Sequence, residues 1–387
     1  MIATVAKDIS STDTLTAAVN PPRIIMAAGG TGGHVYPAIA IADAFIEKHP
    51  DSKVLFVGTR DRMEWQTVPK YGYEIKSVWI SGFHRSFTIQ NLIFPLKLII
   101  SILQSFAILR SFRPDMVIAC GGFASGPIGW AAVKMGIPLI LQEQNSYPGV
   151  TNRILAKQAS IIFTAFDDAA KFLPKEKVHL TGNPVRSKLQ KASRYTALTS
   201  LGFHSENPVL LVMGGSGGAL ALNEVMIQQL DKLHNELGLQ MIWQCGDKYL
   251  KGLINRIDTE NYPNLILTDF IEDMSTAYGA ADLVVTRAGA GTCSELMAVG
   301  LPAVLVPSPN VAGNHQEKNA QSLAASGAAK ILTENKLDRE FTSTVKMLIY
   351  DHKALEQMSD AMLKMAKPDA AQQIVENIST LMKQLNK

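Results

Sequence analysis

The sequence has few cysteines and little net charge, and both features exclude classes of function. Its 387 residues include only Cys120, Cys245 and Cys293, an odd number without C-x-x-C spacing. A disulfide framework and a cysteine-rich zinc site are therefore excluded, and a reducing compartment is expected. The formal net charge of +3 is too small to indicate nucleic acid as a partner.

Several common motifs are also missing. The first 22 residues lack the order of a charged and then an apolar segment that a signal peptide has, so we expect 1–22 to be a flexible lead-in and the protein to be cytoplasmic. No G-x-x-x-x-G-K-[ST] occurs, which excludes ATP hydrolysis of the P-loop kind. No D-x-D motif is present to hold a metal–nucleotide complex.

What the chain does contain is a regular alternation of short apolar runs with helical patterns. This pattern predicts an α/β protein with parallel sheets covered by helices on both faces. The expected strands are 24–28, 53–57, 116–120, 138–141, 161–164, 209–213, 240–244, 264–267, 283–286 and 303–307. Clear helical patterns cover 33–48, 219–234 and 314–325.

One glycine-rich motif occurs twice. RIIMAAGGTGGHVYP (23–37) and PVLLVMGGSGGALAL (208–222) each place G-G-[ST]-G-G between an apolar run and a helix start. The length of the chain already favours two domains. We therefore expect two Rossmann-like domains facing each other across a cleft, 23–183 and 184–366, with a C-terminal helix at 367–387 that crosses back onto the first.

Glycine-rich turns from a strand into a helix are typical of phosphate sites, because backbone amides and the helix dipole point at the ligand. A tight turn without a ligand is the alternative, but two such loops favour binding. NAD fits poorly, since Val35 and Leu220 replace the last glycine of G-x-G-x-x-G and Thr59-Arg60 stand where an acidic residue is required. A third loop, CGGFASGP (120–127), suggests two phosphate-bearing ligands.

A further cluster, TRAGAGTCSELMAVGLPAVLVP (286–307), combines a strand end, Arg287 and a helix expected to start near Thr292. Arg287 and the nearby amides would suit a pyrophosphate. Glu295 is placed to bind a ribose diol, but it would equally suit a capping box with Thr292. Spacing alone leaves both roles open.

These motifs resemble the MurG family of membrane-associated N-acetylglucosaminyltransferases, which have the GT-B architecture. The matching motifs occur in the expected order from Arg23 to the C-terminus: GGTGGHVYP, GGFASGP, QEQNSYPGVTN, GNPVR, GGSGGA, FIEDM, RAGAGTCSEL and NHQEKNA. The resemblance implies transfer of GlcNAc from UDP-GlcNAc to the C4 hydroxyl of MurNAc in lipid I, giving lipid II, with inversion and without an essential metal or cofactor.

The resemblance also assigns residues. It implies that UDP-GlcNAc is held in the C-terminal domain, with Glu295 on the ribose, and that residues of the N-terminal domain touch the donor sugar or the reacting centre. The implied donor-domain residues are Arg186, Ser216, Ile271, Ala290, Gly291, Thr292, Cys293, Ser294, Glu295 and Gln316. Those of the N-terminal domain are Thr31, Gly32, Gly33 and Asn145.

The chain departs from the family pattern at Gln142, Gly217 and His315, where histidine or glutamine is common. His34, after the first glycine loop, is the expected catalytic base or orients the acceptor, since an imidazole titrates in the useful range. Glu143 is the competing candidate. Packing of His34 at a helix start against a backbone carbonyl is the structural alternative.

The most apolar stretch, NLIFPLKLIISILQSFAILRSFR (91–113), nearly meets the length of a membrane span but contains Pro95 and Lys97. Lys97, Ser101, Gln104 and Ser111 form a narrow polar stripe, and we expect most of the apolar face to be core. Residues 81–113 contain Arg85, Lys97, Arg110 and Arg113 without an acidic residue, which favours peripheral contact with an anionic membrane.

A lipid-linked acceptor implies a position on the cytoplasmic face of the plasma (inner) membrane, with wall-synthesis proteins as further partners. The rival interpretations are a UDP-GlcNAc 2-epimerase or another GT-B glycosyltransferase, and, from a different class, a non-catalytic nucleotide-sugar-binding subunit. The apolar–basic segment and the full motif set argue against an epimerase. His34, Asn145 and Glu295 argue against a binding subunit.

Overall fold

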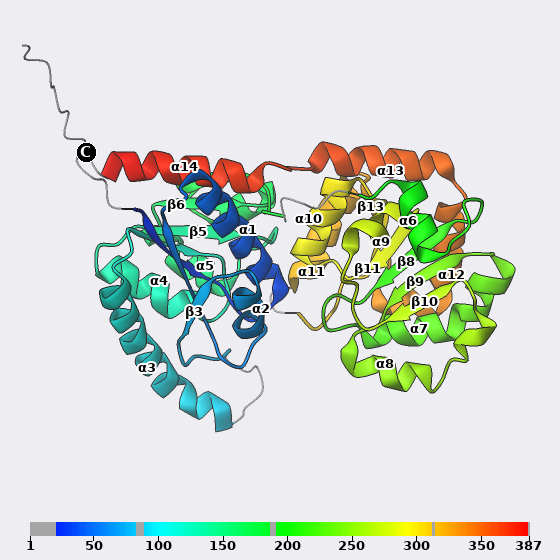
Figure 1. The fold of residues 1–387 in the computed structure, drawn as a ribbon, viewed down its shortest axis with the longest axis horizontal. Helices are drawn as coiled ribbons and strands as arrows, with labels where there is room; N and C mark the ends of the chain where they lie inside the picture. The colour runs from blue at the N-terminus through cyan, green and yellow to red at the C-terminus, as the bar shows by residue number, and fades with distance from the viewer. Residues whose placement is uncertain (1–20, 83–88, 186–190, 312–313, 386–387) are drawn as a thin grey trace, which may run out of the picture.

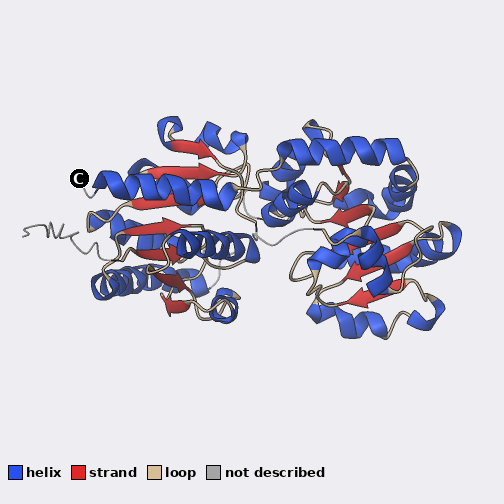
Figure 2. Ribbon diagram, turned by 45° about the horizontal axis from the view of Figure 1, so that its top comes forward, coloured by secondary structure: helices blue, strands red, loops and turns tan. Residues whose placement is uncertain are grey.

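The computed structural model describes residues 21–82, 89–185, 191–311 and 314–385, which form two parallel sheets (Figures 1 and 2). The first has the order β3-β2-β1-β4-β5-β6-β7 and the second the order β10-β9-β8-β11-β12-β13. The first sheet comprises β1 (Arg23–Ala27), β2 (Lys53–Gly58), β3 (Glu74–Ser77), β4 (Met116–Ala119), β5 (Leu139–Glu143), β6 (Ile161–Thr164) and β7 (Val178–Leu180). The second comprises β8 (Val209–Met213), β9 (Gln240–Gln244), β10 (Leu265–Thr268), β11 (Leu283–Thr286), β12 (Ala303–Leu305) and β13 (Ala329–Ile331).

Helices cover both faces of each sheet, as Figure 2 shows, and every strand pair is parallel. Around the first sheet lie α1 (Gly32–Lys48), α2 (Glu64–Lys70), α3 (Ile89–Phe112), α4 (Ser125–Lys134) and α5 (Val150–Leu155). The second sheet is followed or flanked by α6 (Arg194–Leu201), α7 (Leu220–Asp231), α8 (Asp247–Ile254), α9 (Met274–Ala280), α10 (Ala290–Val299), α11 (His315–Ala325), α12 (Leu337–Ile349) and α13 (His352–Met365). The last helix is α14 (Ala370–Leu385). The α/β class expected from the alternation is confirmed.

All ten expected strands are present, with ends that differ by at most two residues, and three further strands are found. These three, β3, β7 and β13, are the last strands at sheet edges. Residues 178–180 of β7 are half-buried or exposed, whereas β4 and β8 are buried throughout. An edge strand needs no continuous apolar run, so these strands carried no pattern to detect.

The C-terminal helix α14 packs on the first sheet's side of the molecule, next to α1, while α13 runs along the second (Figure 1). Ile374, Val375 and Ile378 of α14 are buried in the same core as Ile24 of β1. His49, just after α1, hydrogen-bonds Ser379 at 2.8 Å. The arrangement supports domain limits of 23–183 with 367–387, and 184–366, which we retain as a proposal.

The expectation that most of the apolar face of helix α3 is core is wrong, because that face points outward. Leu92, Leu96, Ile99 and Leu103 recur at helical spacing and are 73%, 54%, 58% and 63% exposed. Three residues of the polar stripe face the protein instead, whereas Ser111 is exposed. Ser101 is buried, Lys97 Nζ donates to Ser81 Oγ at 3.0 Å, and Gln104 Oε1 accepts from the Trp79 amide at 2.7 Å. Most of the apolar face is therefore not core, while Ile108 and Leu109 at the C-terminal end are buried.

Candidate active site at the carboxyl ends of the strands

The glycine loops lie where ligands bind in doubly wound sheets. In each sheet the strand order reverses direction at a central pair, β1 and β4 in the first and β8 and β11 in the second. Loops that follow the carboxyl ends of such a pair border a crevice. All four motifs singled out in the sequence, at 29–33, 120–127, 214–218 and 287–295, follow these four strands.

Two glycine loops of the first domain pack directly on each other. Gly122 has a φ of +84°, and a β-carbon there would overlap the carbonyl group of Gly29. A β-carbon at Gly121 would lie 2.9 Å from Nε2 of His34. The third loop thus forms a surface against which the imidazole of His34 rests, and only glycine permits that approach.

His34 is held in one orientation by the backbone. It lies in the first turn of α1, and its Nδ1 is 3.0 Å from the carbonyl oxygen of Gly29 and 3.4 Å from Oγ1 of Thr31. A carbonyl oxygen only accepts, so Nδ1 carries the proton and Nε2 of the neutral ring has a free lone pair. Burial lowers the pKa of His34, against the opposing effects of the Gly29 carbonyl and the charge of Glu64.

Glu143, at the end of β5, is fully engaged in the loop that follows it. The residue is 1% exposed. Its Oε1 accepts from the backbone and side-chain nitrogens of Asn145 at 3.0 and 3.2 Å. Its Oε2 accepts from the Gly149 amide at 3.0 Å and from Asn152 Nδ2 at 2.8 Å. The carboxylate organises the 144–149 loop and presents no open oxygen to an acceptor.

Asn319 of α11 joins this loop to the second sheet. The side chain is buried, and its Oδ1 accepts from both the amide and Oγ of Ser146 at 3.1 Å. Its Nδ2 donates to the Ala288 carbonyl at 3.2 Å and to Asn145 Oδ1 at 3.3 Å. One amide therefore ties the loops after β5 and β11 together. Sequence reasoning did not single it out.

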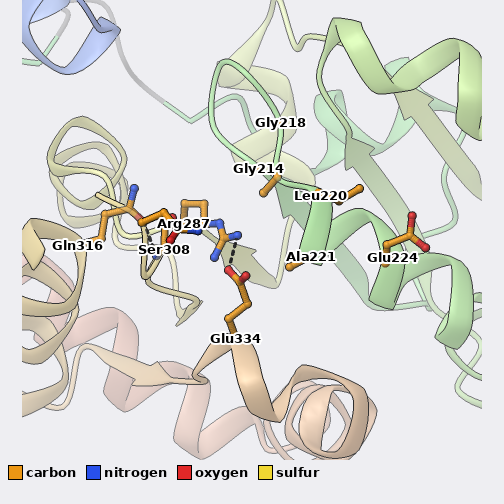
Figure 3. A pocket seen from close by; sticks show the side chains of 11 residues that line it. Gly214, Gly218, Leu220, Ala221, Glu224, Arg287, Ser308, Gln316 and Glu334 are labelled. Carbon is orange, nitrogen blue, oxygen red and sulfur yellow. Dashed lines mark hydrogen bonds and ion pairs between the residues drawn. The ribbon is translucent and has the colours of Figure 1, made fainter. Parts of the chain in front are cut away.

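A cavity of about 570 Å³ opens in the second domain (Figure 3). It lies between the glycine loop after β8 and the elements that carry Arg287, Ser308, Gln316 and Glu334. Gln316 is fixed there, because its Oε1 accepts from the Ser308 amide at 2.8 Å. The cavity combines the amides of a glycine loop, the N-terminal end of α7 and one guanidinium. Each of these groups binds anions, so together they suit a diphosphate.

Arg287 lies in this cavity but is paired with an acidic residue. Its Nη2 is 2.6 Å from Oε2 of Glu334 (Figure 3). Its Nη1 donates to the Val306 carbonyl at 3.2 Å. The Arg287 side chain is only 11% exposed. Glu334 follows β13, a strand that the sequence did not predict. The guanidinium is thus paired with Glu334, and an anion bound in the cavity would compete with that carboxylate for it.

The loop after β11 corrects the capping-box alternative for Glu295. Helix α10 begins at Ala290 after Gly289, so Thr292 lies inside the helix and caps nothing. Glu295 is half-buried, and its Oε2 accepts from the hydroxyl of Tyr278 at 2.9 Å. Cys293 and Ser294 are buried, and Ser294 Oγ donates to the Ala290 carbonyl at 2.9 Å. A ligand at this helix start would meet backbone amides and Gly291.

The remaining predicted residues lie in loops and helix starts of the two domains or outside the described chain. Ser216 is exposed on the second glycine loop, and Ile271 is half-buried after β10. Thr31 is exposed beside Gly32 and Gly33 at the start of α1. Arg186 lies outside the described residues. Among the residues that are described, no cluster of three or more His, Cys, Asp or Glu could hold a metal ion.

His315 shows that the two halves of the site are close. It begins α11, immediately before Gln316 of the cavity. Burial lowers its pKa; Glu143 and the Tyr147 carbonyl oppose the change, whereas His34 and Lys318 add to it. His34 is therefore near enough to act electrostatically on a residue next to this cavity.

Comparison with known proteins agrees with this geometry. Residues 24–164 match the glycosyltransferase family 28 N-terminal domain, and residues 209–374 match the glycosyltransferase family 28 C-terminal domain. The fold and site thus define a glycosyltransferase of the GT-B class.

Individual relatives narrow this class to one family. The UDP-N-acetylglucosamine–N-acetylmuramyl-(pentapeptide) pyrophosphoryl-undecaprenol N-acetylglucosamine transferases of Christiangramia forsetii and Porphyromonas gingivalis are each 44% identical to it. These matches cover 93% of this chain and 97% and 95% of the two relatives. The crystal structure of Acinetobacter baumannii MurG has a TM-score of 0.71 and 30% identity, covering 93% of this chain and all of that one. The chain belongs to the MurG family.

A UDP-GlcNAc 2-epimerase from Neisseria meningitidis bound to UDP-GlcNAc also superimposes, with a TM-score of 0.63. The match covers 92% of this chain and all of that one, at only 17% identity. This likeness shows a common fold and does not support the epimerase interpretation.

Proposed function

We propose that the chain transfers GlcNAc from UDP-GlcNAc to the C4 hydroxyl of MurNAc in undecaprenyl-diphosphate-linked lipid I, giving lipid II, with inversion and without an essential metal. The observation that carries the mechanism is the placement of His34: Nδ1 is bonded to a carbonyl, so Nε2 is available as a base. The cavity lined by Arg287 and Gln316 in the second domain would hold the donor.

The donor nucleotide is assigned to the second domain. Its diphosphate would lie between Arg287 and the glycine loop that contains Ser216, at the N-terminal ends of α7 and α10. Glu295, oriented by Tyr278, would accept from the ribose hydroxyls, and Ile271 would contact the uracil. The residues of α10's first turn, Ala290 to Ser294, contribute amides. Gln316, Asn145 and the 31–33 loop would surround the sugar.

The chemistry is a single displacement at the anomeric carbon. The acceptor C4 oxygen forms the new bond to C1 while the bond from C1 to the β-phosphate oxygen breaks, and UDP leaves with the electron pair. Nε2 of His34 takes the C4 proton as the oxygen attacks, an effect worth about 10²–10⁴ in rate. Arg287 and the helix ends stabilise the negative charge that develops on the leaving diphosphate.

His34 is favoured over Glu143 as the catalytic base because the two side chains differ in their hydrogen bonds. All four donors around the Glu143 carboxylate come from the protein itself. Protonating that carboxylate would turn one acceptor into a donor facing another donor. We therefore assign Glu143 the task of shaping the loop that presents Asn145.

Membrane association is assigned to the exposed face of α3. Residues 92–112 have a mean hydropathy of 2.1 and are long and apolar enough to cross a bilayer, by length and composition alone. Yet Ser101, Ser105, Ile108 and Leu109 pack into the first domain. We therefore propose that α3 lies in the membrane interface, with its apolar stripe buried among lipids and Arg110 exposed for anionic head groups. Arg85 lies outside the described residues. This contact would place the protein on the cytoplasmic face of the inner membrane, next to its lipid-linked acceptor and wall-synthesis proteins.

The test is transfer of labelled GlcNAc from UDP-GlcNAc to a lipid I analogue in EDTA. The wild-type chain and His352→Ala, an exposed histidine at the start of α13, should be equally active. His34→Ala should lose at least about 100-fold in kcat. Activity retained by His34→Ala would assign the base elsewhere. No transfer by the wild-type chain would refute the proposed function.

A further inference from the structure

A carboxylate lies beneath the first glycine loop, where the mechanism above does not use it. Glu64, the first residue of α2, is fully buried. Its Oε1 accepts from the amide and hydroxyl of Thr59 at 3.0 and 2.8 Å, and its Oε2 accepts from the Gly30 amide at 3.0 Å. Within the described residues no basic side chain pairs with it. A buried charge held only by hydrogen bonds is costly, so its site calls for an explanation.

The backbone around Glu64 leaves room for this carboxylate and little else. A β-carbon on Gly29 would lie 2.6 Å from its Oε1, and one on Gly58 would lie 2.6 Å from its Cγ. Glycines at the ends of two neighbouring strands therefore admit the side chain beneath the loop. This close packing fixes the carboxylate relative to the peptide that joins Gly29 and Gly30.

That peptide also binds His34. Its N–H, on Gly30, donates to Glu64, while its carbonyl, on Gly29, accepts from Nδ1 of His34 at 3.0 Å. The carboxylate and the imidazole thus lie at the two ends of one peptide group. Hydrogen bonds in a chain polarise one another, so a charged acceptor on the N–H makes the carbonyl a stronger acceptor.

We propose that Glu64 is a positioning residue for His34, acting through the Gly29–Gly30 peptide as the carboxylate of a histidine–peptide–carboxylate relay. It holds the proton on Nδ1, which leaves Nε2 free to face the acceptor. It also stabilises the imidazolium that forms when Nε2 takes the C4 proton. This inference rests on the proposed function, in which His34 is the base.

The charges around His34 agree with this role. The negative charge of Glu64, on α2, raises the pKa of His34 against the larger lowering by burial. On the opposite side, His315 of α11 is near enough for the two histidines to affect each other, and Glu143 and Lys318 act on His315. Thr31 and the glycines at 121–122 add no charge. Among the residues that the structure describes, Glu64 is thus the carboxylate whose charge raises the pKa of His34.

If Glu64 served only to hold the glycine loop in place, its hydrogen bonds to Thr59 would contribute to that role as well. Thr59→Val removes the 2.8 Å bond to Oε1 but leaves the link through Gly30 intact. Glu64→Gln removes the charge and places an amide N–H against one of the donors. The pair therefore separates loss of the relay from loss of loop stability.

The experiment measures kcat and KM against pH for both variants, and the tautomer of His34 by nitrogen-15 NMR of the full chain. Glu64→Gln should lower kcat at least tenfold with less than a threefold change in KM for UDP-GlcNAc. The acid limb of its pH profile should move to lower pH, because the charge that raised the His34 pKa is gone. Thr59→Val should keep kcat within threefold. Equal losses in both variants, or an unchanged pH profile in Glu64→Gln, would overturn the relay.

If Glu64→Gln does not fold, the wild-type tautomer can still refute the relay. The relay requires the proton on Nδ1 of neutral His34, and a proton on Nε2 in the wild-type chain would refute it. This NMR result does not depend on the reaction catalysed. Absence of GlcNAc transfer by the wild-type chain would instead refute the proposed function, so the two failures are distinguishable.

Discussion

The exposed stripe on α3 allows a quantitative prediction about membrane binding. Replacing Leu96 and Leu103 by serine removes two apolar side chains that are 54% and 63% exposed and make little contribution to the core. Full burial of a leucine is worth about 1.5–3 kcal/mol, so the part of each side chain that is still exposed has about 1–2 kcal/mol to gain from lipid. The double variant should therefore lose about 2–4 kcal/mol of binding, or about 1.5 to 3 decades in affinity.

Co-sedimentation with vesicles that contain anionic lipid measures this loss directly. A matched control is Ile254→Ser, which alters a side chain of similar size and 55% exposure on α8 of the second domain. It should bind vesicles as the wild-type chain does, and both proteins should have unchanged thermal unfolding. Undiminished binding by the Leu96/Leu103 variant would refute the assignment of α3 as the membrane contact. Equal loss in the Ile254 control would show that the effect is not specific to α3.

Three further predictions concern the site. Because burial lowers the pKa of His34 below 6.5, the neutral ring persists at pH 6.5, and kcat/KM should fall only at lower pH; a decline that begins above neutral pH would contradict this. Glu334→Gln should free Arg287 for the diphosphate and lower KM for UDP-GlcNAc about fivefold, an ion-pair effect of about 1 kcal/mol, whereas Glu340→Gln on α12 should not. A higher KM would mean that Glu334 holds Arg287 in place for the donor. Asn319→Ala should lower the free energy of unfolding by about 1–3 kcal/mol, measured in urea, because it leaves the Ser146 amide unpaired; an unchanged midpoint would contradict that role.

The structure refines the site in a way that spacing could not. The capping-box alternative for Glu295 depended on a helix that starts near Thr292, and α10 starts at Ala290 instead. The structural alternative considered for His34 is observed, since its Nδ1 binds a backbone carbonyl, while its role as the base stays a proposal. That bond is also what leaves Nε2 free, so the structural contact and the proposed catalytic role are parts of one arrangement.

The sequence by itself determined the two α/β units, the inner strands and the glycine turns, because these depend on local patterns: apolar runs, helical spacing and residues that permit close backbone approach. Its motifs also sufficed to indicate the family. Only the tertiary structure decided that α3 turns its apolar stripe outward, since spacing shows a stripe but not which side the domain covers. It also decided which groups meet at the site. Three contacts illustrate this: the pairing of Arg287 with Glu334, the bridge through Asn319, and the peptide between Glu64 and His34. The residues that they join are 30 to 174 positions apart in the sequence. Such contacts arise from strand order and packing, and no repeating pattern in the sequence indicates them.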